Sequence, residues 1–167
     1  MFNRFSSVSY FRNFIFGVED SLVSTVGLLS GIAIAGTPRE TIFLTGTVLI
    51  FVEAFSMAAG SFLSEYSAEG FESRAEGPTK RDFVSGMIMF FSYFVSGFIP
   101  LFPYVIISVD GALKLSVALS AVALFILGVV GAKISGTNIV KNGFRMAIVG
   151  GIAISVGMLA GNILSKL

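Results

Sequence analysis

The stretch FGVEDSLVSTVGLLSG (residues 16–31) places two adjacent carboxylates, Glu19 and Asp20, at the start of a long apolar run. The residues that follow, from Ser21 to Pro38, carry no charge. A membrane-spanning helix needs about 17–25 mainly apolar residues, so the run is long enough to cross a bilayer. The stretch therefore predicts a spanning helix that carries acids.

The rest of the chain has the same character. It has 167 residues, of which 54% are hydrophobic and 13% charged, whereas soluble domains carry about 25% charge. The mean hydropathy is +0.90. Further uncharged runs cover 41–52, 54–64, 83–109, 115–132 and 146–165. The first two are short, and we join them into one helix interrupted by Glu53. The sequence predicts an all-α membrane protein, one domain over 1–167, with five spans near 14–36, 41–64, 83–107, 112–133 and 145–166. A closed β-barrel would need alternating segments of about ten residues, and the sequence has none.

The distribution of basic residues predicts the orientation. Eight of the 11 lysines and arginines lie in the N-terminal segment, in the second connection (65–81) and in the fourth. Positive residues accumulate on the cytoplasmic side of membrane proteins. We therefore expect a cytoplasmic N-terminus, an external C-terminus and a short acidic cytoplasmic connection over 65–81. With no cleavage site after the first apolar run, we expect a multi-pass protein of a prokaryotic cytoplasmic membrane.

Composition also limits the chemistry. There is no cysteine and no histidine, so a metal ion has only oxygen ligands and methionine sulfur. No nucleophile–base pair or hydrolytic metal motif is present, and we expect neither an enzyme nor a prosthetic group. The net charge of +1 gives no indication of nucleic-acid binding.

The acids within the spans are the candidate site. An ionisable group at the centre of a span costs at least about 2.5–3.5 kcal/mol and marks a functional site by default. Counting from the expected span ends places Asp20 and Met57 at similar depth, with Glu53 one turn, about 6 Å, further out. Arg12 is within reach of Glu19, which leaves open which of Glu19 and Asp20 faces an ion path. The alternative is that the acids are buried neutral and Met57 only fills space.

Two helical faces support an ion path. One carries Asp20, Ser24, Gly27 and Gly31; the other carries Glu53, Met57, Gly60, Ser61 and Ser64. Beyond the second face, four glutamates at spacings of 4, 3 and 4 form a stripe about 60° wide: Glu65, Glu69, Glu72 and Glu76. We interpret the stripe as a cation-attracting cytoplasmic mouth; the alternative is an ordinary solvated surface.

Two pairs of glycines have the spacing that lets membrane helices approach closely. Gly27 and Gly31 lie in the first span, and Gly157 and Gly161 in the fifth. We expect the first pair to form the seam of a homodimer, with general helix packing as the alternative.

Several motifs resemble the vacuolar iron transporter family. RNFIFGVEDSLVSTVGLLSGIA (12–33) and EAFSMAAGSFLSEYSAE (53–69) are the more specific, and SGFIPLFPY (96–104), ALFILGVVGAKISG (123–136) and NGFRMAIVGGIA (142–153) support them. The resemblance implies a dimer of five-span protomers with the ion path at their interface. It also implies export of Fe²⁺ or Mn²⁺ from the cytosol in exchange for protons. Asp20 and Met57 match motif residues of the family.

The chain departs from the family pattern in two places. Gly60-Ser61-Phe62 stands where many members have Gly-Glu-Tyr, and we expect Glu53 to replace that missing carboxylate. Residues 65–81 also take the place of the cytoplasmic metal-binding domain of plant-type members.

We expect a proton-coupled exporter of divalent transition-metal cations, with Fe²⁺ or Mn²⁺ as substrate and protons as counter-ion. Asp20, Glu53 and Met57 would bind the cation. A carboxylate in a desolvated site holds a proton more readily than one in water, so the same acids would exchange metal for protons. The alternatives are a channel or carrier for another divalent cation such as Mg²⁺, and a scaffold or accessory subunit that transports nothing.

Overall fold

The protein is a bundle of long helices. The computed structural model describes residues 2–73 and 77–166, with side chains described over 7–71 and 77–166. The helices are α1 (Phe2–Ile34), α2 (Arg39–Ser73), α3 (Lys80–Leu101), α4 (Pro103–Ile106), α5 (Val109–Ser135) and α6 (Ile139–Leu164). All except the short α4 are long and apolar enough to cross a membrane. The predicted all-α fold with five spanning helices is confirmed.

The helices extend beyond the predicted spans at the end of the bundle that holds the N-terminus. There α1 begins at Phe2 rather than near residue 14, and α2 continues to Ser73 rather than ending near residue 64. Gly70 does not interrupt α2, and it is not among the glycines with a positive φ. The hydrophobic run marks only the part of a helix that fits in lipid, so the polar turns beyond it were missed.

Prolines end the third span at the opposite end of the bundle. Pro100 lies in the last turn of α3, and Pro103 is the first residue of α4. Proline has no N–H to donate, so a helix carbonyl near the break is left free. Two polar side chains bind carbonyls here: Ser116 Oγ donates to the Pro100 oxygen at 2.7 Å, and Arg39 Nε donates to the Tyr104 oxygen at 2.7 Å. The expected break at this end of α3 is thus stabilised by α5 and α2.

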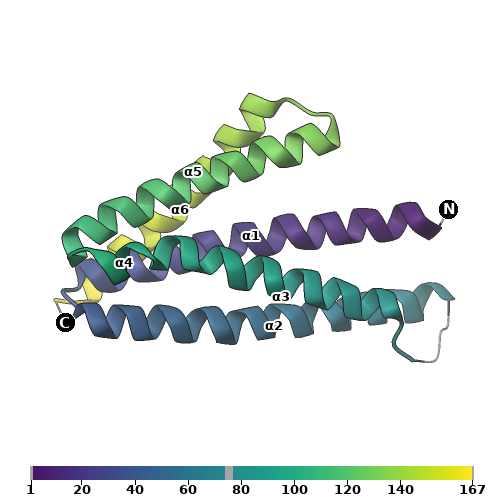
Figure 1. Ribbon diagram of the computed structural model, residues 1–167, viewed down its shortest axis with the longest axis horizontal. Coiled ribbons are helices and arrows are strands. Elements are labelled where there is room, and N and C mark those ends of the chain that lie inside the picture. The colour runs from purple at the N-terminus through teal and green to yellow at the C-terminus, as the bar shows by residue number, and fades with distance from the viewer. Residues whose placement is uncertain (1, 74–76, 167) are drawn as a thin grey trace.

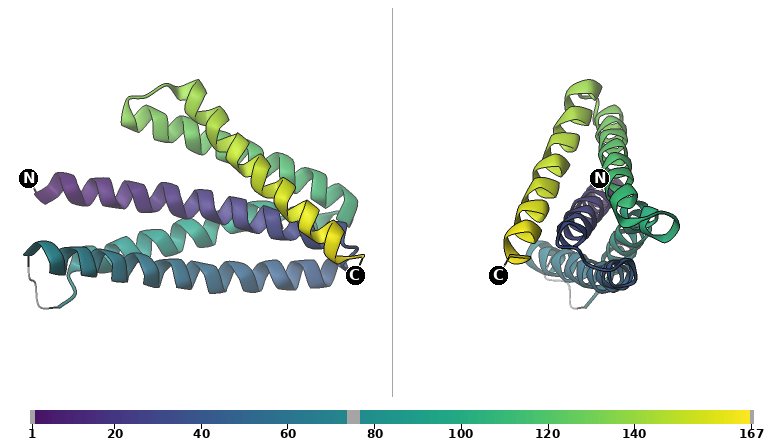
Figure 2. Two further views of the ribbon diagram at one scale, coloured as in Figure 1. Left: turned by 180° about the vertical axis from the view of Figure 1, so that it is seen from behind. Right: turned by 90° about the vertical axis from the view of Figure 1, so that its left-hand side faces the viewer.

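The first helix is the centre of the bundle. It packs against α2, α3, α5 and α6, and the end-on view of Figure 2 shows it among them. The α5–α6 hairpin leans away from α1, α2 and α3 at its 135–139 turn and meets them at the other end (Figure 1). The two termini lie at opposite ends of the bundle, as an odd number of spans requires.

The two halves of the bundle are filled differently. A cluster of fully or nearly fully buried apolar side chains closes the half that holds α4; it includes Leu29, Ile42, Ile50, Leu101 and Tyr104. The other half, toward the N-terminus, contains the polar groups and the cavity described next.

The glycine pairs meet within one chain. A Cβ atom on Gly31 would lie 2.6 Å from the Gly157 oxygen, and one on Gly161 would collide with the Gly31 backbone. Gly27 and Gly31 therefore serve the contact between α1 and α6, where small residues let the backbones touch. The seam expected for a homodimer is occupied within the protomer, and the homodimer itself stays a prediction.

Candidate ion-binding site

Electrostatic interactions link three side chains of α1, α2 and α3. Asp20 of α1 lies within electrostatic reach of Glu53 of α2, and both lie within reach of the Tyr93 hydroxyl of α3. The two carboxylates are partly buried, whereas Tyr93 is fully buried. Asp20 and Glu53 are the two acids proposed from the sequence to share a site, and that shared site stays a prediction. We call Asp20, Glu53 and Tyr93 the oxygen layer.

Serines of α1 hold Tyr93 in place. Its hydroxyl shares a hydrogen bond of 2.7 Å with Ser24 Oγ, and its backbone oxygen accepts a hydrogen bond of 2.6 Å from Ser21 Oγ. Ser24 is one helical turn beyond Asp20. The phenol is therefore fixed next to the carboxylate pair by bonds to the same helix that carries Asp20.

No ion pair to a carboxylate of the oxygen layer occurs among the side chains that the structure describes. Within the described side chains, no lysine or arginine forms an ion pair with Asp20 or Glu53. Two carboxylates facing each other at partial burial repel each other unless a cation or a proton lies between them. Over 7–71 and 77–166 no group of three or more carboxylates could hold a metal ion, so a cation here would rely on two carboxylates and neutral ligands.

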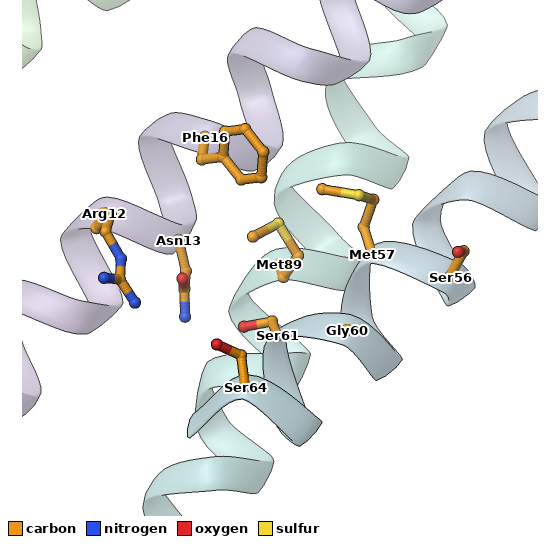
Figure 3. A pocket seen from close by; sticks show the side chains of 9 residues that line it. All are labelled: Arg12, Asn13, Phe16, Ser56, Met57, Gly60, Ser61, Ser64 and Met89. Carbon is orange, nitrogen blue, oxygen red and sulfur yellow. The ribbon is translucent and has the colours of Figure 1, made fainter. Parts of the chain in front are cut away.

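A cavity of about 620 Å³ lies beside the oxygen layer, toward the N-terminal end of the bundle. Arg12, Asn13 and Phe16 of α1 line it, with Met89 of α3 and five residues of α2: Ser56, Met57, Gly60, Ser61 and Ser64 (Figure 3). Water occupies about 30 Å³ per molecule in the liquid, so the cavity has room for a hydrated ion. Four members of the predicted small, polar face of α2 line the cavity, whereas its fifth member, Glu53, does not.

Some polar atoms at the cavity have no protein partner. Asn13 Nδ2 and Ser61 Oγ are buried, and neither has a hydrogen-bond partner among the described residues. Buried polar groups normally find a partner in protein or in ordered water. Asn13 and Ser61 thus bring two unsatisfied polar groups to the cavity wall.

The cavity and the oxygen layer are stacked one helical turn apart. Asp20 follows Phe16 by four residues, Glu53 precedes Met57 by four, and Tyr93 follows Met89 by four. Since α2 runs antiparallel to α1 and α3, all three steps point away from the N-terminal end. Four residues rise about 6 Å, so the oxygen layer lies about 6 Å beyond the level of Phe16, Met57 and Met89.

The structure supplies two observations on the predicted depths. Asp20 lies within electrostatic reach of Glu53, and Phe16, one turn before Asp20, lines the cavity together with Met57. The expected depths were counted from span ends, and both helices extend past those ends. Met57 therefore lies next to the carboxylates along the helix axis, and the structure does not place it among them.

Glu19 faces a different environment from Asp20. Two charges act on Glu19: that of the neighbouring Asp20 and that of Arg145 on α6. The expected contact with Arg12 is not made, because Arg12 binds Glu65 instead. Consecutive residues of a helix point about 100° apart. Asp20 is therefore the acid that faces α2 and α3.

The acidic stripe is not an open mouth at its first two positions. Glu65 is 5% exposed and accepts hydrogen bonds from Ser9 Oγ and Arg12. Arg81 lies 3.3 Å from Glu65 and 3.4 Å from Glu69. We call Ser9, Arg12, Glu65, Glu69 and Arg81 the arginine cluster. The expected cation-attracting role stays a prediction. At Glu65 a cation would compete with arginines from α1 and α3, which spacing along α2 alone does not reveal.

The last two positions of the stripe give less information. Glu72 lies on α2, but its side chain is outside the described ones, and Glu76 lies outside the described residues. Their proposed role stays a prediction.

The sequence analysis missed the contribution of α3. Tyr93 and Met89 face α1 and α2 together with buried serines, at Ser85, Ser92 and Ser96. These positions repeat at intervals of 3, 4 and 7, which is the period of one helix face. That periodicity in SGMIMFFSYFVS (85–96) was the available signal.

With this geometry in view, comparison with known proteins identifies the family. The sequence pattern described as the VIT family matches residues 11–83 and 67–162. The chain belongs to the VIT family. The matched segments include most of α1, all of α2 and α3 and every residue of the oxygen layer. They overlap at 67–83, in and around the connection between α2 and α3.

Named relatives of this VIT-family chain come from plants. It is 25% identical to "Vacuolar iron transporter homolog 2" of Oryza sativa subsp. japonica, over 88% of this chain and 86% of the relative. It is 26% identical to "Vacuolar iron transporter homolog 4" of Arabidopsis thaliana, over 88% of this chain and 80% of the relative. The similarity thus extends over most of both chains.

Proposed function

We propose that this protein exports divalent transition-metal cations, Fe²⁺ foremost and Mn²⁺ second, from the cytosol in exchange for protons. Membership of the VIT family and relatives named as iron transporter homologs support the choice of substrate. The observation that carries the proposal is the pair of carboxylates, Asp20 and Glu53, that lie within electrostatic reach of each other in the spans without a basic ion-pair partner among the described residues.

The proposed cycle uses the cavity and the oxygen layer in turn. A hydrated cation enters the cavity from the N-terminal end, which we expect to face the cytosol, and moves one turn inward to the two carboxylates. Asp20 and Glu53 supply two negative charges, and the Tyr93 hydroxyl supplies a neutral oxygen. After the cation leaves on the far side, protons replace it on the same carboxylates. The apolar cluster around Leu29 and Leu101 must open for that release.

Flux in proteoliposomes tests the proposal. Purified protein should drive Fe²⁺ uptake when a pH gradient is imposed, and collapse of the gradient with a protonophore should stop it. Asp20→Asn should abolish the flux, while Asp110→Asn, a matched change at an exposed position of α5, should leave it intact. Full transport by Asp20→Asn would remove the carboxylate pair from the mechanism.

A second candidate has an observation in its favour. The oxygen layer contains only oxygen ligands, and such ligands suit Mg²⁺ and Mn²⁺, while Met57 lies in the neighbouring layer. The alternative is therefore a channel or carrier for a hard divalent cation. Inhibition of Fe²⁺ flux by a modest excess of Mg²⁺ would favour this alternative, and indifference to Mg²⁺ would favour the first. The host membrane stays a prediction. We expect a prokaryotic cytoplasmic membrane, whereas the plant relatives have names that refer to the vacuole.

A further inference from the structure

The short helix α4 lies at the end of the bundle opposite the N-terminus (Figure 1). Its Tyr104 is fully buried and belongs to the apolar cluster that contains Leu29 and Leu101. Leu101 follows Tyr93 by eight residues of α3, which places it about 12 Å beyond the oxygen layer along that helix. An ion that leaves the oxygen layer toward this end therefore meets the cluster that Tyr104 helps to close.

A second cavity lies beside α4. It has a volume of about 370 Å³ and is lined by three residues of α2 and two of α4: Arg39, Glu40, Phe43, Tyr104 and Val105. We call it the α4 cavity. Tyr104 belongs both to the apolar cluster and to the wall of this cavity. Helix α4 therefore forms part of the boundary between them, and it has free space on one side.

The backbone of α4 does little to hold the helix in place. The helix has four residues, and isolated helices shorter than about 12–15 residues are marginal in water. Its first residue, Pro103, has no N–H to donate to α3. The residue after its last turn, Ile107, is extended, with φ −131° and ψ 170°. The position of α4 therefore depends on contacts with its neighbours.

Arg39 supplies the polar contact from α2. It is the first residue of that helix, and its Nε donates to the Tyr104 backbone oxygen at 2.7 Å. Its Nη2 donates to the Val105 backbone oxygen. Among the described side chains Arg39 forms no ion pair with a carboxylate, so its charge is directed to the carbonyls of α4. Ser116 of α5 binds the Pro100 oxygen instead, and thus fixes the end of α3 rather than α4.

We propose that α4 is the gate through which the cation leaves the protein, with Tyr104 as the side chain that closes it and Arg39 as the positioning residue that holds it closed. When Arg39 releases the two carbonyls, α4 moves toward the α4 cavity and the apolar cluster opens. This inference rests on the proposed function and names the exit of the same path. Arg39 does not contact the ion; it acts through the position of α4.

Thiol labelling tests the gate without any transport measurement. The chain has no cysteine, so an introduced one is the only thiol. Ala33→Cys places it in the apolar cluster, at a position that is 8% exposed. A water-soluble thiol reagent should label it slowly, and about tenfold faster when Arg39→Gln is added, because loss of a hydrogen bond from a charged group shifts an equilibrium by at least that factor. Lys114→Gln, which removes an exposed charge of α5, should leave the rate unchanged.

A second thiol separates gate opening from general loosening of the bundle. Ser85→Cys lies fully buried in α3, in the half that holds the N-terminus. Its labelling should stay slow with and without Arg39→Gln. Equal acceleration at both positions, or no acceleration at Ala33→Cys, overturns the role of Arg39.

Blocking the α4 cavity tests whether the exit lies there. Val105→Cys, labelled with a bulky thiol reagent, places a large group in the cavity and should stop Fe²⁺ flux in proteoliposomes. The melting-temperature shift on adding Mn²⁺ should remain, because the oxygen layer is unchanged. The same reagent should not affect the wild-type protein, which has no thiol. Undiminished flux after labelling overturns the exit at α4 while the proposed function stands. If the wild-type protein drives no Fe²⁺ flux, the proposed function is wrong and the exit is overturned with it, whereas the labelling rates still show whether Arg39 holds α4.

Discussion

Helix α2 carries two glutamates, Glu53 and Glu65, in opposite electrostatic situations. Glu65 is 5% exposed and lies between two arginines, Arg12 at 3.4 Å and Arg81 at 3.3 Å. Glu53, twelve residues earlier, faces another acid, Asp20, and no ion pair to it forms among the described residues. Two glutamates of one helix thus differ in their neighbours: arginines neutralise Glu65, whereas the nearby charge at Glu53 is another carboxylate.

The difference separates a structural acid from a functional one. An acid paired with arginine is satisfied in the resting protein and gains nothing from a visiting cation. A pair of facing carboxylates costs free energy until a cation or proton arrives. The arginine cluster therefore stabilises the N-terminal ends of α1 and α3 against α2, whereas we propose that the oxygen layer uses its unpaired charge for transport.

Neutralising one acid of the oxygen layer should have the largest effect. We expect Asp20→Asn or Glu53→Gln to reduce Fe²⁺ flux by about a hundredfold, since loss of groups around a metal costs up to that factor even from the outer shell. Neither variant should lower the melting temperature, because the substitution removes a repulsion. Flux in proteoliposomes and thermal unfolding in detergent measure the two effects. A variant that unfolds early and still transports would reverse the assignment of roles.

Neutralising Glu65, the buried acid of the arginine cluster, should lower stability and leave transport intact. Glu65→Gln leaves Arg12 and Arg81 without their shared partner. Breaking a buried pair costs about 3–5 kcal/mol, and we expect about 2–3 kcal/mol here, because the Arg12 side chain is 70% exposed and water screens it. The melting temperature should fall by about 5–10 °C, with flux per folded molecule nearly unchanged. A loss of flux at unchanged stability would return Glu65 to the ion path.

The contrast also shows what the sequence could and could not predict. Hydrophobic runs gave the number and approximate place of the spans, because the bilayer sets their length. An acid among spanning residues indicates a site by default, and Asp20 and Glu53, the acids chosen on that ground, lie within electrostatic reach of each other. The neutralisation of Glu65 did not follow, because Arg12 and Arg81 are distant in sequence and approach it only through the packing of α1 and α3 on α2.

The depth of each residue along its helix was the second feature that the sequence could not predict. The depths of Asp20 and Met57 were counted from span ends, but the ends of α1 and α2 lie in polar sequence that a hydrophobic run does not mark. The role of Gly31 was uncertain for a related reason: its spacing with Gly27 predicts a close helix contact, but it does not say with which helix. In the structure the partner is α6 of the same chain.

Metal should stabilise the protein through the oxygen layer only. At ten times its dissociation constant, Mn²⁺ should add about 1.4 kcal/mol to the stability of wild-type protein, which raises the melting temperature by about 4 °C. Asp20→Asn should lose this shift, because one of the two charges that bind the ion is gone. Glu65→Gln should melt earlier but show the same shift on adding Mn²⁺. Equal shifts in wild type and Asp20→Asn would place the ion elsewhere.

The smallest effect is expected from the neutral member of the oxygen layer. Tyr93→Phe removes only the hydroxyl that binds Ser24 at 2.7 Å and faces the two carboxylates. A hydrogen bond to a charged group is worth about 1.5–3 kcal/mol. We expect the low end of this range, about a tenfold rise in the concentration of Fe²⁺ that gives half-maximal flux, because a water molecule can take part of the role.

Another buried tyrosine supplies the control for this effect. Tyr104 is also fully buried, and burial raises the pKa of its phenol to about 12, so the hydroxyl stays protonated at neutral pH. Tyr104 lies in α4, away from the carboxylates, and its hydroxyl has no hydrogen-bond partner among the described residues. Tyr104→Phe should therefore leave the half-maximal concentration unchanged and should not lower stability. If both variants behave alike, the Tyr93 hydroxyl serves packing, and the carboxylates must hold the ion without help from α3.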